Sequence, residues 1–270
     1  MAPMTPATDH LPPLGEPRSR EVVAIRVDAT SYGDATERIV RWASAGEANY
    51  VCVANVHMTM EAYDDPAFRE VVNGASLVVP DGMPLVWALR SLGIGGATRV
   101  RGPDLTIRVA EEAAKLQLPI GVYGGSPEVA TAFATTLQER FPMLEVSSVI
   151  SPPYRQLTEA EELAFAHQIR DSGARIVFVG LGCPKQEKWM ARNVDAVGAV
   201  LIGVGAAFDF HTGNVREAPR WMQSSGIEWL FRLSQEPRRL WKRYAKHNPR
   251  FIALLTQQLL RAGTRAEPRS

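Results

Sequence analysis

The spacing of apolar residues along the chain changes repeatedly between the pattern of a buried strand and that of a helix. Short runs of Val, Ile and Leu predict strands at Val22–Val27, Tyr50–Ala54, Leu77–Val79, Ile120–Tyr123, Leu144–Val149, Ile176–Val179 and Val200–Val204. Helical spacing predicts helices at Asp34–Ala45, His57–Asp64, Pro66–Asn73, Pro84–Leu92, Leu105–Leu116, Pro127–Phe141, Glu159–Ser172 and Gln186–Val194. This alternation indicates an α/β fold that is Rossmann-like, with a mostly parallel sheet and helices on both faces.

Neither end of the chain shows the alternation of strand and helix spacing. The first twenty residues are rich in proline and contain no apolar segment of a secretory signal, so residues 1–20 are expected to form a disordered tail. The α/β core is expected to span residues 21–213, followed by a basic helical appendage over residues 214–260 and a second disordered tail over residues 261–270. The best apolar run, Phe251–Leu260, is too short to cross a membrane and contains two glutamines.

The amino-acid composition is that of an ordinary folded protein and excludes few functional classes. The chain has 270 residues, 46% of them hydrophobic and 22% charged, and its net charge of +1 gives no overall signal for nucleic acid. The two cysteines, Cys52 and Cys183, do not suggest a disulfide framework, and a reducing cytosol fits them best. No cysteine and histidine cluster has metal-ligand spacing, so no metal site is expected.

The C-terminal segment, in contrast, is strongly basic. Between Val215 and Arg265 there are eleven Lys and Arg residues against three Glu, interleaved with aromatic residues. Such a mixture suits an anionic membrane surface, single-stranded nucleic acid, or a helical appendage whose aromatics pack on the core. The arginines considered for a ligand or membrane are Arg216, Arg220, Arg232, Arg238, Arg239 and Arg243.

The segment Gly182–Glu187 carries the most informative chemistry. It follows an apolar run, and ligands in open α/β sheets gather just past the carboxyl ends of the strands. Glycine there lets backbone N–H groups approach a phosphate, and a cation, an amide and a carboxylate stand beside it. A tight turn facing water would explain the glycine but not three different polar groups. We therefore assign Gly182, Pro184, Lys185, Gln186 and Glu187 to a ligand site.

Polar residues also follow two other expected strands. Asp81 and Gly82 come after Leu77–Val79, where the carboxylate is well placed to take a proton from a substrate hydroxyl. A turn or helix-capping aspartate is the simpler interpretation of the same residues. Asn55 follows Tyr50–Ala54 and is either a helix N-cap or a hydrogen-bonding group of the site.

Two loops contain candidate phosphate-binding groups. Arg99 and Arg101 precede Asp104 at the start of an expected helix, and either guanidinium could pair with a diphosphate or face solvent. Gly124 and Gly125 stand directly before another helix, whose free N–H groups could meet a phosphate or a sugar hydroxyl.

The segment Gly203–Phe208 resembles the start of a dinucleotide-binding fingerprint, but Phe208 stands where the third glycine should be. Residues 209–213 are expected to form a loop, so the required helix is missing, and NAD binding is rejected. Gly205 and Asp209 remain candidates for contact with another ligand. No cofactor is expected.

Several common catalytic motifs are missing from the sequence. There is no P-loop, no nucleophile elbow, no HExxH pair, and no Asp-x-Asp pair to hold a divalent metal between phosphates. Charge on a phosphate leaving group would then have to be met by basic side chains, backbone N–H groups or helix dipoles.

Taken in order along the chain, these segments resemble the WecG/TagA/CpsF family of bacterial glycosyltransferases. The resemblance runs from about Tyr50 to Phe251. The matching stretches are Pro80–Gly82, Arg99–Leu105, Tyr123–Gly125, Gly182–Trp189, Gly203–Phe210, Ala218–Trp221, Gly226–Leu233 and Glu236–Tyr244.

The resemblance implies an inverting, metal-independent transfer of a sugar from a UDP-sugar to a polyprenyl-diphosphate-linked saccharide. Donors in the family carry N-acetylmannosamine, its uronic acid or a glucose-type sugar, and the products enter envelope polymers or exopolysaccharide. The implied location is peripheral, on the inner face of the bacterial cytoplasmic membrane. The implied partners are the two substrates and an anionic membrane surface, without nucleic acid, and self-association into a homo-oligomer stays open.

The resemblance also assigns roles by position. Asp81 matches the proposed catalytic base, Arg99 matches an arginine thought to engage the donor diphosphate, and Gln186 belongs to a Pro-Lys-Gln-Glu signature. The C-terminal arginines match an appendage thought to dock on the membrane and cover the lipid diphosphate. Val53 departs from the pattern, since some members have Thr there. The competing class is a non-catalytic α/β module that binds a nucleotide or nucleic acid and uses the basic tail as a scaffold.

Overall fold

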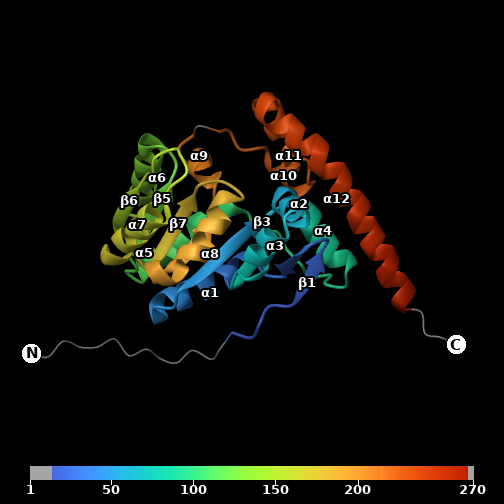
Figure 1. Cartoon of the computed structure of the whole chain (residues 1–270), viewed down its shortest axis with the longest axis horizontal. Coiled ribbons are helices and arrows are strands. Elements are labelled where there is room, and N and C mark those ends of the chain that lie inside the picture. Colours follow the sequence, from blue (N-terminus) through green and yellow to red (C-terminus); the bar gives the residue numbers. More distant parts are fainter. Residues whose placement is uncertain (1–13, 214, 267–270) are drawn as a thin grey trace, which may run out of the picture.

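The computed structural model describes residues 14–213 and 215–266, and a parallel sheet forms its centre (Figure 1). Its strands are β3 (Asn49–Ala54), β4 (Leu77–Pro80), β5 (Ile120–Gly124), β6 (Val146–Ile150), β7 (Ile176–Gly180) and β8 (Val200–Gly203). The six strands lie in the order β4-β3-β8-β7-β5-β6, and every neighbouring pair is parallel. The Rossmann-like α/β class that the alternating pattern predicts is confirmed.

Helices cover both faces of the sheet because successive side chains of a strand point to opposite sides. Val51 and Val53 of β3 pack on one face, and Cys52 and Ala54 pack on the other. The first face is covered by α1 (Tyr32–Ala45), α5 (Gly102–Lys115), α6 (Pro127–Arg140) and α9 (Ala207–His211). The second is covered by α2 (Val56–Asp64), α3 (Pro66–Asn73), α4 (Met83–Ser91), α7 (Glu159–Asp171) and α8 (Lys185–Val197). Burial on both faces explains why β3, β4, β5, β7 and β8 are continuous apolar runs, whereas the edge strand β6 contains two serines and is only partly buried.

The single strand predicted at Val22–Val27 is wrong. The chain instead forms an antiparallel hairpin of β1 (Ser19–Val22) and β2 (Ile25–Asp28), because Val23 adopts a left-handed conformation with φ of 60° that turns the chain. The carboxylate of Asp28 accepts a hydrogen bond of 2.8 Å from the backbone N–H of Val78 and so covers the open edge of β4. Since β1 begins at Ser19, the expected tail overlaps the hairpin by two residues; residues 1–13 of it lie outside the described part.

The C-terminal region consists of α10 (Arg220–Ser224), α11 (Glu228–Gln235) and the long α12 (Pro237–Ala266), which runs along one side of the molecule in Figure 1. Phe251 of α12 is buried in the core. The side chain of Gln258 accepts a hydrogen bond from the Val23 N–H and donates one to the Glu21 carbonyl of the hairpin. The helix continues to Ala266, so the tail expected from residue 261 begins too early, and residues 267–270 lie outside the described part. Within the described residues, none of the helices has the length and apolar character needed to span a bilayer.

Candidate active site

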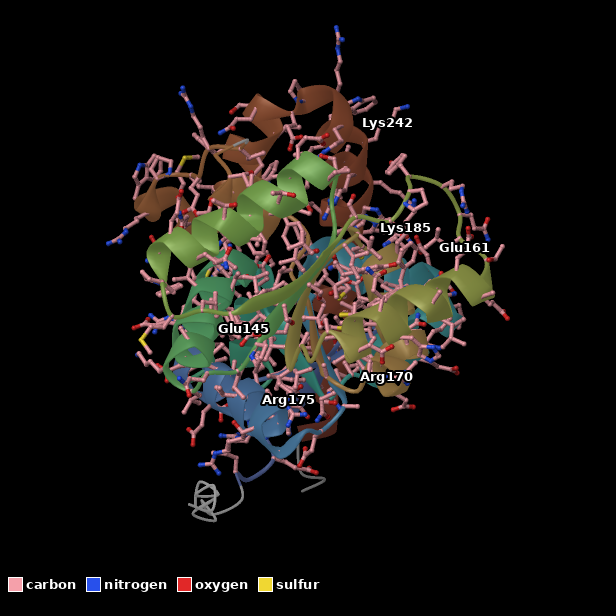
Figure 2. The ribbon with its side chains drawn as sticks, turned by 90° about the vertical axis from the view of Figure 1, so that its left-hand side faces the viewer. Glu145, Glu161, Arg170, Arg175, Lys185 and Lys242 are labelled. Carbon is pink, nitrogen blue, oxygen red and sulfur yellow. The ribbon has the colours of Figure 1, made fainter. Side chains whose placement is uncertain are left out.

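The carboxyl ends of the parallel strands point toward the C-terminal region. Arg175 precedes β7 and Lys185 follows it, and in Figure 2 Lys185 lies nearer than Arg175 to Lys242 of α12. Every polar segment singled out from the sequence after a strand therefore lies at one edge of the sheet. That edge and the C-terminal helices together form the candidate site.

Four of the predicted site glycines lie at this edge, and we call them the strand-end glycines: Gly124, Gly125, Gly182 and Gly205. All four have positive φ angles, and Gly124 shows why glycine is needed, because a Cβ there would lie 2.6 Å from the backbone of Gly180. β5 and β7 are neighbours in the sheet, but the chain after β5 continues to β6 on one side and the chain after β7 continues to β8 on the other side. Such a topological switch point is where open α/β sheets bind ligands.

Gln186 and Glu187 are buried at the start of α8, so their side chains do not face water as a simple surface turn would require. The Gln186 carbonyl accepts a hydrogen bond of 3.2 Å from the Gly182 N–H, and its amide donates at 2.7 Å to Oε1 of Glu187. Burial raises the pKa of Glu187 to about 7. Gln186, held by Glu187, therefore fixes the backbone of the turn at Gly182 from the buried side.

Lys185 and Pro184 lie nearer the surface. Lys185 is exposed and its ammonium lies 5.4 Å from the ring of Tyr154, which is fully exposed. Pro184 precedes the first helical residue of α8 and is half-buried. Of the predicted polar trio, only the lysine is available to a ligand in solution.

The loop predicted at residues 209–213 is wrong at its beginning, because α9 extends to His211. Phe208 explains the departure from a dinucleotide fingerprint: its ring is buried, stacks on Phe133 at 4.3 Å and fills the space that a Cβ at Gly180 would need. Asp209 is half-buried on α9. A large ring therefore occupies the position where the fingerprint requires glycine.

A cavity of about 340 Å³ lies between the ends of β3 and β4 and the C-terminal helices. Of the predicted substrate-site residues, Asn55, Asp81, Gly82 and Arg99 line it; the strand-end glycines do not. Asn55 is also the N-cap of α2, where its side chain accepts a hydrogen bond of 3.2 Å from the Met58 N–H. Both interpretations of Asn55 therefore agree with its position.

Asp81 is partly buried, and its carboxylate is held at the start of a helix. Oδ1 accepts a hydrogen bond of 3.1 Å from the backbone N–H of Gly102, the first residue of α5. The capping residue of the following helix α4 is Gly82 and not Asp81. Burial raises the pKa of Asp81, opposed chiefly by the positive charge of Arg99. Asp81 thus combines a fixed position with the basicity that a general base needs.

A contact series joins Asp81 to the strand-end glycines. Gly102 bonds to Asp81, and a Cβ on Gly102 would lie 3.3 Å from Val53 and 3.7 Å from the Val204 carbonyl. A Cβ on Gly205, the residue after Val204, would lie 3.2 Å from the side chain of Gln186. Val53, the position at which the sequence departs from the expected pattern, is buried. The two parts of the predicted site are therefore neighbours along one edge of the sheet.

The arginines predicted to bind a diphosphate make ion pairs with protein carboxylates. Arg99 pairs with Glu228 of α11 at 2.6 Å. The buried Arg101 pairs with Asp104 at 3.2 Å and with Glu228 at 3.4 Å, and it does not line the cavity. Asp104 also accepts a hydrogen bond of 2.8 Å from Tyr32. Arg101 and Asp104 therefore hold the α5 loop against the C-terminal region.

The six C-terminal arginines fall into two groups. Arg232 and Arg243 line the cavity, and the Nε atom of each is buried without a hydrogen-bond partner among the described residues. A buried guanidinium nitrogen without a hydrogen-bond partner is costly unless an acceptor joins it. The exposed group comprises Arg216, Arg220, Arg238 and Arg239. Arg232 and Arg243 are therefore placed to bind an anion in the cavity. The four exposed arginines could contact only a partner outside the cavity, such as an anionic surface.

Further residues of the cavity were not predicted from the sequence. Glu228, Trp229 and Tyr244 line it, and so do His57 and His247. Glu228 is one of only three acidic residues between Val215 and Arg265. An isolated carboxylate among so many cations could have been recognised in the sequence as a candidate ion-pair partner. The sequence contains no metal-ligand spacing and no metal site was expected; in the folded chain His57, Glu61 and His247 bring their ligand atoms within 4.8 Å of one another. The sequence could not reveal this cluster, because His247 lies far along the chain from His57 and Glu61.

The comparison with known families agrees with this geometry. Residues 20–265 match the family described as Glycosyl transferase WecG/TagA/CpsF family. The match spans the core and the C-terminal helices together, and it favours the enzyme over the non-catalytic nucleotide or nucleic-acid module. The chain belongs to the WecG/TagA/CpsF family and is a glycosyltransferase.

Proposed function

We propose that this glycosyltransferase moves a sugar from a UDP-sugar to the saccharide of a polyprenyl-diphosphate carrier, with inversion at the anomeric carbon. The observation that carries the proposal is the position of Asp81, which lines one cavity with Arg99, Arg232 and Arg243. A carboxylate among cations suits a reaction in which an alcohol loses a proton beside diphosphate groups.

The donor is assigned to the strand-end glycines. The glycine turns at the β5 and β7 switch point suit the nucleoside end of the donor, since open α/β sheets bind ligands at such a point. From there, the contact series through Gly205 and Gly102 leads to Asp81. The diphosphate is proposed to extend along this series toward Arg99, so that the anomeric carbon bonded to it faces Asp81.

The acceptor is assigned to the cavity. The unpartnered Nε donors of Arg232 and Arg243 suit the lipid diphosphate, since a guanidinium and phosphate oxygens form charge-assisted hydrogen bonds. The exposed Arg238 and Arg239, together with the exposed rings of Trp221 and Trp241, are proposed to meet the anionic inner face of the cytoplasmic membrane.

Transfer is a single displacement. The acceptor hydroxyl gives its proton to Asp81 as its oxygen forms a bond to the anomeric carbon, and the bond from that carbon to UDP breaks. Arg99 and backbone N–H groups stabilise the charge that develops on UDP. The raised pKa makes Asp81 a stronger base, while Arg99 and the Gly102 N–H favour its ionised form. No divalent ion on the diphosphate is required.

The test is a screen of UDP-sugars with a short-chain lipid-diphosphate saccharide as acceptor, read by mass spectrometry. The proposal expects one donor to give an acceptor heavier by one sugar, with release of UDP and no dependence on added Mg²⁺ or Mn²⁺. Release of UDP without a glycosylated lipid, or transfer only with added Mg²⁺, would contradict it. Protein that binds oligonucleotides in a salt-sensitive manner without transfer would favour the non-catalytic class.

A further inference from the structure

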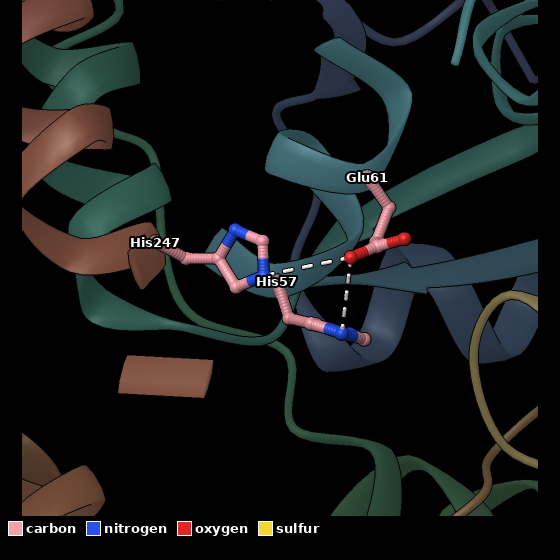
Figure 3. A group of neighbouring side chains, drawn as sticks. All are labelled: His57, Glu61 and His247. Atoms are coloured by element: carbon pink, nitrogen blue, oxygen red, sulfur yellow. Dashed lines mark ion pairs between the residues drawn. The ribbon is translucent and has the colours of Figure 1, made fainter. Parts of the chain in front are cut away.

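Two histidines and a glutamate from helices far apart in the sequence meet beside the cavity (Figure 3). His57 and Glu61 are one turn apart on α2, and His247 comes from α12. Nε2 of His57 lies 3.6 Å from Oε1 of Glu61, and Nε2 of His247 lies 3.4 Å from the same oxygen. The two rings meet edge to face, with centroids 5.4 Å apart.

These separations fit the ligand shell of a transition-metal ion. Zinc binds histidine nitrogen and carboxylate oxygen at about 2.0–2.2 Å, so two ligands of a tetrahedral site lie roughly 3.3–3.6 Å apart. Both distances to the Glu61 oxygen already have this size. The two histidine nitrogens lie within 4.8 Å of each other, and a small approach of α12 to α2 would complete the arrangement.

The chemistry of the cluster points the same way. Two imidazoles and one carboxylate are ligands that zinc favours, whereas Mg²⁺ and Ca²⁺ prefer oxygen alone. His247 is buried and His57 is partly buried. The Nδ1 atoms of both are buried without a partner among the described residues. The Nε2 atoms, which face Glu61, are the ones that would bind an ion.

We propose that His57, Glu61 and His247 bind one divalent transition-metal ion of the zinc class, which fastens α12 to α2 at the wall of the cavity. A water molecule from the cavity would supply the fourth ligand. The ion is a clip between the core and the C-terminal region and takes no part in the transfer step. The proposal stands on these three residues and is independent of the donor and acceptor assigned above.

The surrounding charges set the expected strength of binding. Lys246 and Arg250 share the single carboxylate of Asp64, at 3.3 and 2.5 Å, so these three side chains keep one net positive charge. Arg243 lines the same cavity and contributes to the lowered pKa of His57, so its positive charge opposes a bound cation. We therefore expect weaker binding than in a closed site with four protein ligands, and the titration has to cover a wide range of zinc concentration.

The experiment uses the full chain without a histidine tag, treated with a chelator and then dialysed against zinc chloride. Elemental analysis is expected to find one zinc per chain, Co²⁺ is expected to give visible absorption bands, and zinc but not Mg²⁺ is expected to raise the melting temperature. His247→Ala and Glu61→Gln are expected to weaken zinc binding by at least about 10–100-fold, the loss that follows removal of even an outer partner of a metal ligand.

His167→Ala is the matched control, because His167 lies on α7 outside the cluster and should leave zinc binding unchanged. Circular dichroism without zinc checks that each variant is folded; if His247→Ala is not, Glu61→Gln keeps the size of the side chain and decides the question. Wild-type protein without bound zinc would overturn the proposal. Equal zinc binding by wild type and folded Glu61→Gln or His247→Ala would also overturn it.

Discussion

Arg99 donates from Nη2 to Oε2 of Glu228 at 2.6 Å, and this ion pair joins the sheet edge to α11 inside the wall of the cavity. The other nitrogens of Arg99 donate to the backbone carbonyls of Gln223 and Asp81. Each guanidinium nitrogen of the arginine assigned to the donor diphosphate thus already has a protein acceptor. A diphosphate at Arg99 must therefore compete with Glu228 or share Arg99 with it.

Glu228→Gln is predicted to lower KM for the UDP-sugar without lowering kcat. Glutamine keeps an acceptor for Arg99 but removes the competing negative charge, and the effect should reach up to about tenfold, equivalent to ~1.4 kcal/mol. Steady-state kinetics over a range of donor concentration measures it. Glu217→Gln is the control, since Glu217 reaches Arg101 at 3.6 Å but forms no ion pair with Arg99. An unchanged or raised KM would mean that Glu228 only positions Arg99.

Asp81→Asn is predicted to reduce kcat by about 10²–10⁴, the usual contribution of a general base. The protein should stay folded, because the amide oxygen of asparagine can still accept the hydrogen bond from the Gly102 N–H. Single-turnover rates and a melting curve are measured together. Asp195→Asn, at an exposed position of α8, is the control for loss of one negative charge. Wild-type turnover by Asp81→Asn would leave Asp81 as a cap of α5 alone.

The sequence was sufficient for most of the fold because the parallel strands are buried on both faces and the helices carry local signals. Ser126 and Thr158 cap α6 and α7 with their side chains, and Gly46 ends α1 in a left-handed conformation. The hairpin before α1 could not be foreseen in the same way. Its turn depends on the positive φ of Val23, which is supported by a hydrogen bond from α12.

The candidate site could be predicted only where it follows a strand. Asp81, Asn55 and the strand-end glycines come directly after apolar runs, and topology brings such positions to one edge. Glu228 and His247 lie on helices whose apolar pattern says nothing of where they dock. Their partners Arg99 and Glu61 are distant in sequence, so the ion pair and the histidine cluster needed tertiary structure to be found.

Glu187 is predicted to make stability fall as pH rises. Its pKa is raised from 4.5 to about 7 in the folded protein, so the folded state binds more protons than the unfolded state between these values. The stability that protonated Glu187 contributes is therefore present below about pH 4.5 and lost as pH rises through about 7. The change is of the order of 3 kcal/mol at 1.36 kcal/mol per pKa unit.

Glu187→Gln should remove that component, since glutamine is neutral at every pH and its carbonyl can keep the bond from the Gln186 amide. Urea unfolding at pH 5, 6, 7 and 8 gives the difference in the free energy of unfolding between wild type and variant. This difference isolates Glu187 from the histidines, whose lowered pKa values act in both proteins. A difference independent of pH would show that Glu187 is ionised or neutral throughout.

The exposed arginines of α12 are predicted to bind the protein to anionic vesicles. Removing the whole C-terminal region is a poor test, because Phe251, Leu240 and His247 are buried and the core would be left uncovered. Arg238→Gln with Arg239→Gln keeps the packing and removes two cations. At about 1 kcal/mol for each basic residue near an anionic surface, the double variant should bind such vesicles roughly 30-fold more weakly.

Co-sedimentation with vesicles containing phosphatidylserine measures the effect, and neutral phosphatidylcholine vesicles give the baseline. Arg170→Gln with Arg175→Gln is the matched control: both are exposed, and Figure 2 shows them toward the opposite end of the molecule from Lys242. Because the attraction is electrostatic and screened within about 8 Å at physiological salt, binding of the wild type should also weaken as salt is added. Equal loss of binding in both double variants would indicate a general effect of net charge and remove α12 as the docking surface.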